Sequence, residues 1–364
     1  MTLPDLLRYT LEAGASDLHL TVNTPPQVRV DGHLRRLSGP DLTPEQTKSL
    51  VYSVLTDLQK KQFEDTWELD LAFGLTGVGR FRCNVFNQRG AVGAVFRLIP
   101  EKIRGLDDLG LPPVLGQLAD RPRGLVLVTG PTCSGKSTTL AAMIDRINQT
   151  RPAHILTIED PIEYLHTHKR ALVNQRELHA DTRGFTPALR AALREDPDVV
   201  LVGEMRDLET MEAAMKLAET GHLTLATLHT NSAAQTVTRI IDAFPSHQQA
   251  QIRTQLSLVL EGIVCQALVP KASGSGRVAA LEILVATPAI RNLIREDKIH
   301  QIYSAMQTGQ ERLGMQTLNQ ALARLIEQRV ISKDTAMSTT SNRDEVTTML
   351  ARAAAARADA AVTR

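Results

Sequence analysis

The hydrophobic and polar positions of this 364-residue chain follow two patterns, one after the other. Up to about residue 100, short runs alternate apolar with polar residues, and glycine and proline separate them. This period of two predicts half-buried strands, the last three forming an antiparallel meander. A helix is expected over Leu42–Leu58, because Thr43, Pro44 and Gln46 form a capping box at its start. The alternating runs are SDLHLTV, PQVRVDGHLRRL, ELDLAFGL, GRFRCNVFNQRG and AVGAVFRLIP.

From about residue 115 the pattern changes to continuous apolar runs, each followed by helical periodicity. Strands that are apolar throughout and alternate with helices predict a parallel sheet covered on both faces. The stretch Leu256–Val269 is read as a buried helix; Glu261 and Gln266 interrupt it, and it is shorter than the ~18–20 apolar residues that span a bilayer. After residue 285 the pattern is helical and ends in an Ala/Arg-rich tail that can fray. The four apolar runs are GLVLVTG, HILTIED, DVVLVGE and HLTLATLH.

These patterns divide the chain into four parts. An N-terminal domain covers 1–100, and a linker rich in proline, glycine and charge covers 101–114. An α/β core covers 115–285, and a helical C-terminal region covers 286–364.

Composition narrows the class of protein. Hydrophobic residues make up 43% and charged residues 22%, which is ordinary for a globular protein. The net charge of +1 gives no general attraction to nucleic acid or to an anionic membrane. Cys83, Cys133 and Cys265 form no CxxC pair, which argues against a zinc site or a disulfide framework. The amino terminus lacks the features of a signal peptide, so a cytosolic protein is expected.

A glycine-rich segment between a predicted strand, Leu125–Thr129, and a predicted helix, Thr138–Asn148, fits the phosphate-binding pattern G-x-x-x-x-G-K-[ST]. Its glycines let backbone N–H groups converge on phosphate oxygens at a helix N-terminus. Lys136 is expected to bridge the β- and γ-phosphates of ATP, and the Ser137 hydroxyl to bind Mg²⁺. The alternative is a turn that binds no ligand. The candidate nucleotide-binding residues are Gly130, Pro131, Thr132, Cys133, Ser134, Gly135, Lys136, Ser137 and Thr138.

Acidic residues follow two of the later predicted strands, at the end where an open α/β sheet binds its ligands. Glu204 ends the run DVVLVGE and is the candidate catalytic carboxylate and Mg²⁺ ligand, since hydrolysis needs a group that orients water. The alternative is a surface ion pair between Glu204 and Arg206. Glu159 and Glu163 lie in TIEDPIE and are further catalytic candidates; the alternative is a solvated acidic loop.

Two histidines flank the fourth apolar run. His229 follows the run and is the better candidate for a group that senses the γ-phosphate, whereas His222 precedes it and is the weaker one. The alternative for each is an ordinary histidine with structural partners only.

Four segments occur in an order that resembles a known family: GPTCSGKST, ILTIEDPIEYLH, VLVGEMRDLET and AETGHLTLATLHTNSA. They resemble the Walker A, Asp, Walker B and His boxes of type II/IV secretion ATPases, and within these the chain is similar to PilT-type pilus retraction ATPases. ASDLHLTVNTPPQVRVDGHL resembles the PAS-like N-terminal domain of that group, and residues 289–296, AIRNLIRE, resemble its motif associated with retraction. The resemblance implies an α/β protein in which a PAS-like α+β domain joins a RecA-like P-loop ATPase core with a helical C-terminal region.

The resemblance also implies a homohexameric ring in which ATP binding and hydrolysis swing one domain against the other. Such a motor drives type IV pilus retraction and twitching motility from the cytoplasmic side of the inner membrane, at the pilus base. Its implied partners are a PilC-like platform protein and a PilU-like ATPase, and nucleic acid is not among them.

The resemblance further suggests that Arg80, Arg82 and Arg97 reach the phosphates and offset their charge; the alternative is a solvated strand face. Arg291 and Arg295 lie one helical turn apart, so both can face a partner or simply solvate a core helix.

Cys133 departs from the family, which usually has glycine there. A side chain restricts positive φ, so a tighter loop is expected, and nearby amide dipoles and Lys136 favour a reactive thiolate. The chain also lacks the long N-terminal region and the CxxC pairs of extension ATPases, which favours retraction.

Three alternatives stay open. One is a PilU-like accessory retraction ATPase, and another is a nucleotide-gated scaffold that does not hydrolyse ATP. A nucleic-acid translocase is the third, and the near-zero net charge disfavours it.

Overall fold

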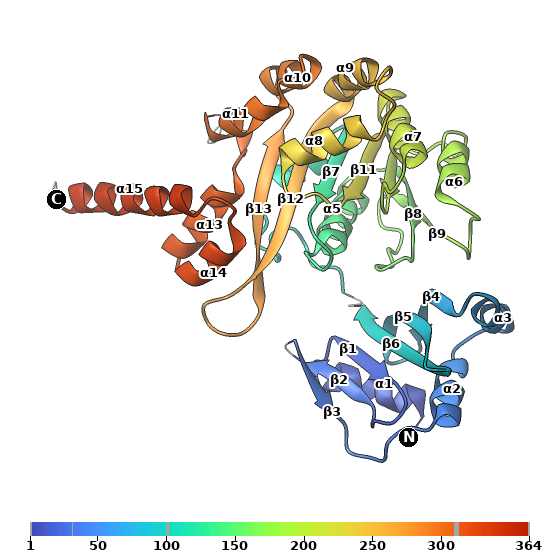
Figure 1. Cartoon of the computed structure of the whole chain (residues 1–364). Coiled ribbons are helices and arrows are strands. Elements are labelled where there is room, and N and C mark those ends of the chain that lie inside the picture. Colours follow the sequence, from blue (N-terminus) through green and yellow to red (C-terminus); the bar gives the residue numbers. More distant parts are fainter. Residues whose placement is uncertain (1, 31, 100–101, 309–312, 363–364) are drawn as a thin grey trace. The chain divides into compact units, whose positions relative to one another are not determined.

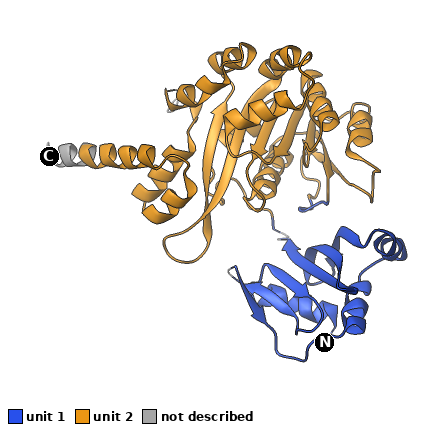
Figure 2. Ribbon diagram, in the orientation of Figure 1, with its two compact units in different colours: residues 1–102, 161–165 blue, residues 103–160, 166–364 orange. Residues whose placement is uncertain are grey.

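The computed structural model describes residues 2–30, 32–99, 102–308 and 313–362, with side chains in the last helix as far as residue 355. The predicted limits of the N-terminal domain at 1 and 100, the start of the linker at 101 and the end of the tail at 363–364 lie outside these ranges. The chain forms two compact units (Figure 2). The first contains residues 1–102 and the short segment 161–165; the second contains 103–160 and 166–364.

The first unit contains an antiparallel sheet of six strands in the order β3-β2-β1-β6-β5-β4 (Figure 1). One face of the sheet is apolar and contributes Phe81, Cys83 and Phe96 to the unit's own core, because alternate residues of a strand point to opposite faces. The predicted meander of the last three strands is confirmed. The strands are β1 (Asp17–Leu20), β2 (Gln27–Val30), β3 (His33–Arg36), β4 (Glu68–Leu75), β5 (Gly79–Gln88) and β6 (Ala91–Ile99).

The helix predicted over Leu42–Leu58 is two helices, so its predicted extent is wrong. The capping box of Thr43 and Gln46 is confirmed at the start of α2 (Pro44–Tyr52). A second capping box, in which Thr56 accepts from the Gln59 amide, starts α3 (Asp57–Thr66). The second box marks the break and could have been read from the sequence. A further helix, α1 (Leu3–Glu12), precedes the sheet.

The second unit is built on a sheet of seven strands in the order β13-β12-β7-β11-β10-β8-β9 (Figure 1). All neighbouring strands are parallel except β12 and β13, which form an antiparallel pair. The predicted α/β class with a mostly parallel sheet is confirmed. The strands are β7 (Gly124–Thr129), β8 (His154–Glu159), β9 (Leu172–Glu177), β10 (Val199–Val202), β11 (Leu223–Leu228), β12 (Leu260–Pro270) and β13 (Arg277–Val285).

The predicted buried helix over Leu256–Val269 is wrong. Its first residues end α9, and the remainder is strand β12, which pairs with β7 on one side and β13 on the other. A continuous apolar run has no periodicity that distinguishes a buried strand from a buried helix. Here the pairing with neighbouring strands determines that the segment is a strand. Strands β9 and β13 were not predicted either; β9 is short of apolar residues, with Val173 its one fully buried position.

Helices connect and cover the strands of the second unit, and those after residue 285 confirm the predicted helical region. No helix among the described residues is long and apolar enough to cross a membrane. The helices are α4 (Val114–Ala119), α5 (Lys136–Thr150), α6 (Phe185–Ala192), α7 (Leu208–Glu219), α8 (Ala233–Asp242), α9 (Gln249–Val259), α10 (Pro288–Arg295), the 3₁₀ helix η1 (Ile299–Gln301), α11 (Ile302–Thr308), α13 (Leu318–Glu327), α14 (Lys333–Thr339) and α15 (Arg343–Val362).

Candidate nucleotide site

The predicted phosphate loop connects the buried strand β7 to the first turn of α5. Gly130 and Gly135 have φ values of 139° and 89°. A Cβ atom at Gly130 would lie 2.3 Å from the backbone oxygen of Gln266, so only glycine fits there. The hydroxyl of Ser134 is buried and has no hydrogen-bond partner within the described chain. A close-fitting glycine loop at the N-terminus of a 15-residue helix suits a phosphate group.

Lys136 begins α5 and its ammonium group lies across the loop. Its Nζ donates to the carbonyl oxygens of Gly130 at 2.8 Å and Pro131 at 3.0 Å. Lys136, Ser137 and Thr138 are half-buried in the first turn of the helix, whereas the tip of the loop is exposed. The loop therefore holds its one cation at the position where phosphate oxygens would enter.

Cys133 keeps the left-handed backbone conformation, with φ at 64°. The tighter loop expected from its side chain is therefore not observed. A side chain in this conformation costs about 1–2 kcal/mol relative to an ordinary backbone conformation. The thiol is exposed, in contrast to those of Cys83 and Cys265, which are buried.

The strand order places the acidic and histidine candidates side by side. β11 lies next to β7, and β10 lies next to β11, so the carboxyl ends of the three strands meet at one edge. Beyond these ends, Glu204 Oε1 lies 3.1 Å from His229 Nε2, and Glu204 Oε2 lies 2.8 Å from Arg206 Nε. The ion pair with Arg206 is thus present, but Arg206 is more than half exposed, and the second oxygen of Glu204 contacts His229. His222 precedes β11, so it lies at the amino end of that strand, opposite the carboxyl end that His229 follows.

Glu159 is the last residue of β8, the next strand along the sheet. Its Oε1 accepts from the Thr157 hydroxyl at 2.7 Å and from the Gln175 amide at 3.2 Å. Two donors therefore orient this carboxylate from neighbouring strand positions.

Glu163 lies in the segment 161–165, which belongs to the first unit. Within that unit Arg82 lies 3.6 Å from the Glu163 carboxylate, and Arg80 donates to the carbonyl oxygen of Ile162 at 3.2 Å. The structure thus brings Glu163 together with two of the three predicted arginines.

The three arginines of the first unit share one face of its sheet. Arg80 and Arg82 are two residues apart on β5, and Arg82 pairs directly with Arg97 on β6. Arg97 Nε lies 2.8 Å from Asp17 Oδ1, and Asp17 is only 4% exposed. Asp70 lies 3.9 Å from Arg82 as well, so this face carries paired arginine and aspartate side chains, opposite the apolar face that forms the core.

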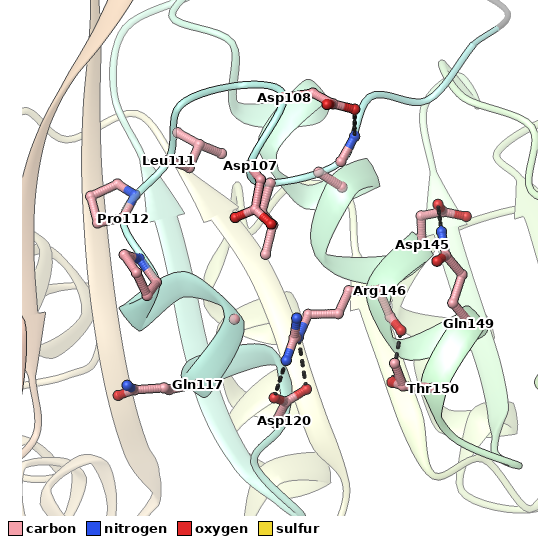
Figure 3. A pocket seen from close by; sticks show the side chains of 15 residues that line it. Asp107, Asp108, Leu111, Pro112, Gln117, Asp120, Asp145, Arg146, Gln149 and Thr150 are labelled. Atoms are coloured by element: carbon pink, nitrogen blue, oxygen red, sulfur yellow. Dashed lines mark hydrogen bonds and ion pairs between the residues drawn. The ribbon is translucent and has the colours of Figure 1, made fainter.

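A cavity of about 490 Å³ in the second unit has residues of α5 in its lining (Figure 3), and none of residues 130–138 belongs to that lining. Gly116 and Gln117 on α4 line it, and its lining residues on α5 run from Ala142 to Thr150, ~9–21 Å beyond Lys136 at 1.5 Å per residue. Arg146 makes two hydrogen bonds to Asp120, at 3.0 and 2.7 Å. The remaining charged lining residues are aspartates, so this cavity is unsuited to phosphate.

No group of three histidine, cysteine, aspartate or glutamate side chains in the described part of the chain could hold a metal ion. The Ser137 side chain is half-buried in the first turn of α5, and its hydroxyl is an oxygen ligand of the kind that Mg²⁺ accepts alongside phosphate oxygens.

Sequence reasoning missed one residue beneath the loop. Gln266, on β12, bonds the loop at Ser134 and the helix at Thr139. A lone glutamine in an apolar run was the available signal. Because the run was interpreted as a helix, the sequence did not indicate toward which element the Gln266 side chain points.

A mostly parallel sheet in which the interior strand β7 leads through a glycine loop into a helix, with an acid and a histidine beside it, defines a P-loop ATPase. The family model of the type II/IV secretion system protein matches residues 2–355, and the chain belongs to this family.

Individual relatives agree with this family. The type IV pilus retractation ATPase PilT of Pseudomonas aeruginosa is 55% identical over 336 residues, which cover 92% of this chain and 97% of that protein. The type IV pilus ATPase PilU of the same organism is 43% identical over 350 residues, covering 96% and 91%. A crystal structure of the pilus retraction motor PilT with bound ADP matches with a TM-score of 0.87 and 52% identity, covering 95% of this chain and 98% of that one.

Proposed function

We propose that this chain is an ATP-hydrolysing motor that retracts type IV pili and so supports twitching motility. The observation that carries the proposal is the contact of Glu204 with His229 beside the phosphate loop, in a chain 55% identical to a pilus retractation ATPase. The relative named PilU is 43% identical, which favours the retraction motor over a PilU-like accessory ATPase.

Each candidate residue receives a role in this proposal. Residues 130–138 bind the phosphates of ATP, with Lys136 neutralising their charge. Glu204 orients the attacking water and accepts its proton, and His229, 3.1 Å from Glu204, responds to the γ-phosphate. Mg²⁺ supplies charge neutralisation at the phosphates, and its proposed protein ligands are Ser137 and Glu204.

The remaining candidates support the reaction. Glu159 and Glu163 are further catalytic carboxylates for the task of orienting the water. Arg80, Arg82 and Arg97 offset negative charge that develops on the phosphoryl oxygens. The proposed assembly is a homohexamer on the cytoplasmic side of the inner membrane, at the pilus base. Its proposed partners are a PilC-like platform protein and a PilU-like ATPase.

The decisive experiment compares ATP binding and ATP turnover in Glu204→Gln. This change keeps the shape of the side chain but removes the base, so kcat should fall by at least about 100-fold while ATP binding stays close to wild type. Glu209→Gln is the matched control, because Glu209 is exposed in the first turn of α7, five residues further on. Unchanged turnover in Glu204→Gln would show that the carboxylate is not catalytic, and wild-type protein that binds ATP without turnover would identify a scaffold.

The cellular role needs a separate test. A deletion strain of the source organism should carry excess pili and should not twitch. The wild-type gene should restore twitching, and the Glu204→Gln gene should not. Normal twitching in the deletion strain would contradict the retraction role.

A further inference from the structure

Gln266 lies directly beneath the phosphate loop. It follows Cys265, which pairs with Thr129, the last residue of β7. Strand β12 therefore continues past the end of β7, alongside the start of the loop. Gln266 is only 5% exposed, although glutamine is seldom buried.

The side-chain amide of Gln266 connects the phosphate loop to helix α5. Its Nε2 donates to the carbonyl oxygen of Ser134 at 2.7 Å, and its Oε1 accepts from the Thr139 hydroxyl at 2.7 Å. Ser134 belongs to the loop, and Thr139 belongs to the second turn of α5. A carboxamide offers one donor group and one acceptor on a single planar group, which matches this pair of partners.

The loop also contacts Gln266 through its two glycines. A Cβ at Gly130 would lie 2.3 Å from the Gln266 backbone oxygen, and a Cβ at Gly135 would lie 2.8 Å from Gln266 Nε2. The glycines therefore serve two purposes here: they turn the backbone toward a phosphate, and they let the loop lie against Gln266.

We infer that Gln266 is a positioning residue for nucleotide binding, which holds the loop in the conformation that presents its amide N–H groups to the phosphates. The inference rests on the proposed nucleotide binding. Gln266 does not touch the phosphates; it acts by satisfying the buried carbonyl of Ser134 and the hydroxyl of Thr139.

A purely structural role would have a different signature. A buried glutamine that only stabilises the fold lowers thermal stability when it is replaced, without a specific loss of nucleotide affinity. Gln316 provides the matched control in the same unit. It is 6% exposed, and its Nε2 donates to the carbonyl oxygen of Leu281 at 2.9 Å, on β13 at the edge of the sheet.

The test measures ADP affinity and steady-state ATP kinetics in the full-length protein with Gln266→Met and Gln316→Met. Methionine keeps the length of the side chain and removes the hydrogen bonds of the amide, which for Gln266 are those to Ser134 and Thr139. Gln266→Met should raise the Kd for ADP and the KM for ATP about tenfold, with kcat lowered less than threefold. Gln316→Met should leave both constants at the wild-type level, while the two variants lose similar thermal stability.

A second pair of variants tests the inference if Gln266→Met does not fold. Thr139→Val removes the donor to Gln266 and should raise the Kd for ADP about threefold, whereas Thr139→Ser keeps the hydroxyl and should bind like wild type. Unchanged affinity in Gln266→Met, or an equal loss in Gln316→Met, would overturn the inference. Equal affinities of the valine and serine variants would overturn it as well. Wild-type protein that does not bind ADP would overturn the proposed function itself.

Discussion

Replacing Arg291 by alanine should destabilise the second unit strongly, although Arg291 lies in a helix near the surface. Its guanidinium group makes four hydrogen bonds, three of which join α10 to the end of α9 and the start of β12. Nε donates to the carbonyl of Ala286 at 3.0 Å, and Nη1 donates to those of Ser257 at 2.9 Å and Leu258 at 2.7 Å. Nη2 lies 2.7 Å from Glu261 Oε1.

The magnitude follows from the burial of this ion pair. The side chains of Arg291 and Glu261 are 24% and 18% exposed, so water replaces the lost bonds only in part. Breaking a buried pair by removing one partner costs about 3–5 kcal/mol, and this partly exposed pair should lie at the lower end, about 3 kcal/mol. Arg121, 3.3 Å from the other oxygen of Glu261, limits the loss. The transition of the second unit should then shift down by roughly 6 °C.

Arg295→Ala is the matched control, one turn further along the same helix. Arg295 is exposed and donates to Asn292 Oδ1 at 2.6 Å, so its loss should change the free energy of unfolding by less than about 0.5 kcal/mol. Differential scanning calorimetry of both variants measures the difference. Equal midpoints for the two variants would refute the reasoning. The structure thus separates two arginines that the sequence treats alike, because Arg291 faces its own chain and Arg295 faces solvent.

Two further predictions concern single side chains. Iodoacetamide should label native protein at Cys133 alone, because the other two thiols are buried, and saturating ATP should slow this labelling; equal rates with and without ATP would contradict a nucleotide at the loop. Burial lowers the pKa of His166 from 6.5 to about 4, so the unfolded chain takes up a proton that the folded chain does not when the pH falls below 6.5. Stability should therefore fall between pH 6.5 and about 4, by up to about 2 kcal/mol at pH 5, and His166→Gln should weaken this dependence in urea unfolding at pH 7 and 5. The same pH dependence in the variant would show that other groups cause it.

The sequence predicts those parts of the molecule that local chemistry determines. The strand, glycine loop and helix around Lys136 are where the pattern places them, because the phosphate-loop motif specifies its own local structure. The positions of Glu204 and His229 after the ends of buried strands also follow from the sequence, whereas the order of those strands in the sheet comes from the structure. Continuous apolar runs alternating with helices leave few arrangements other than a parallel sheet.

Contacts made across the fold were not predictable in this way. The acceptors of Arg291 lie up to 34 residues away in the chain, and no periodicity within AIRNLIRE distinguishes it from Arg295. The arginines on β5 and β6 could be placed on strands, but the bond from Arg97 to the buried Asp17 depends on the pairing of β1 with β6. Such pairings join residues 80 positions apart, and local propensity carries no information about them.

The strand that was misread as a helix shows why this matters for the site. Taken as a helix, Leu256–Val269 presents Glu261 and Gln266 as two polar interruptions of an apolar segment. As strand β12, it places Glu261 at a β-bulge, within reach of Arg291 and close against Gly124 at the start of β7. Five residues further on, Gln266 bonds the phosphate loop that follows the end of β7. One strand therefore contacts both the phosphate loop and helix α10. Neither contact can be recognised from the sequence motifs, because each depends on how β12 pairs with β7.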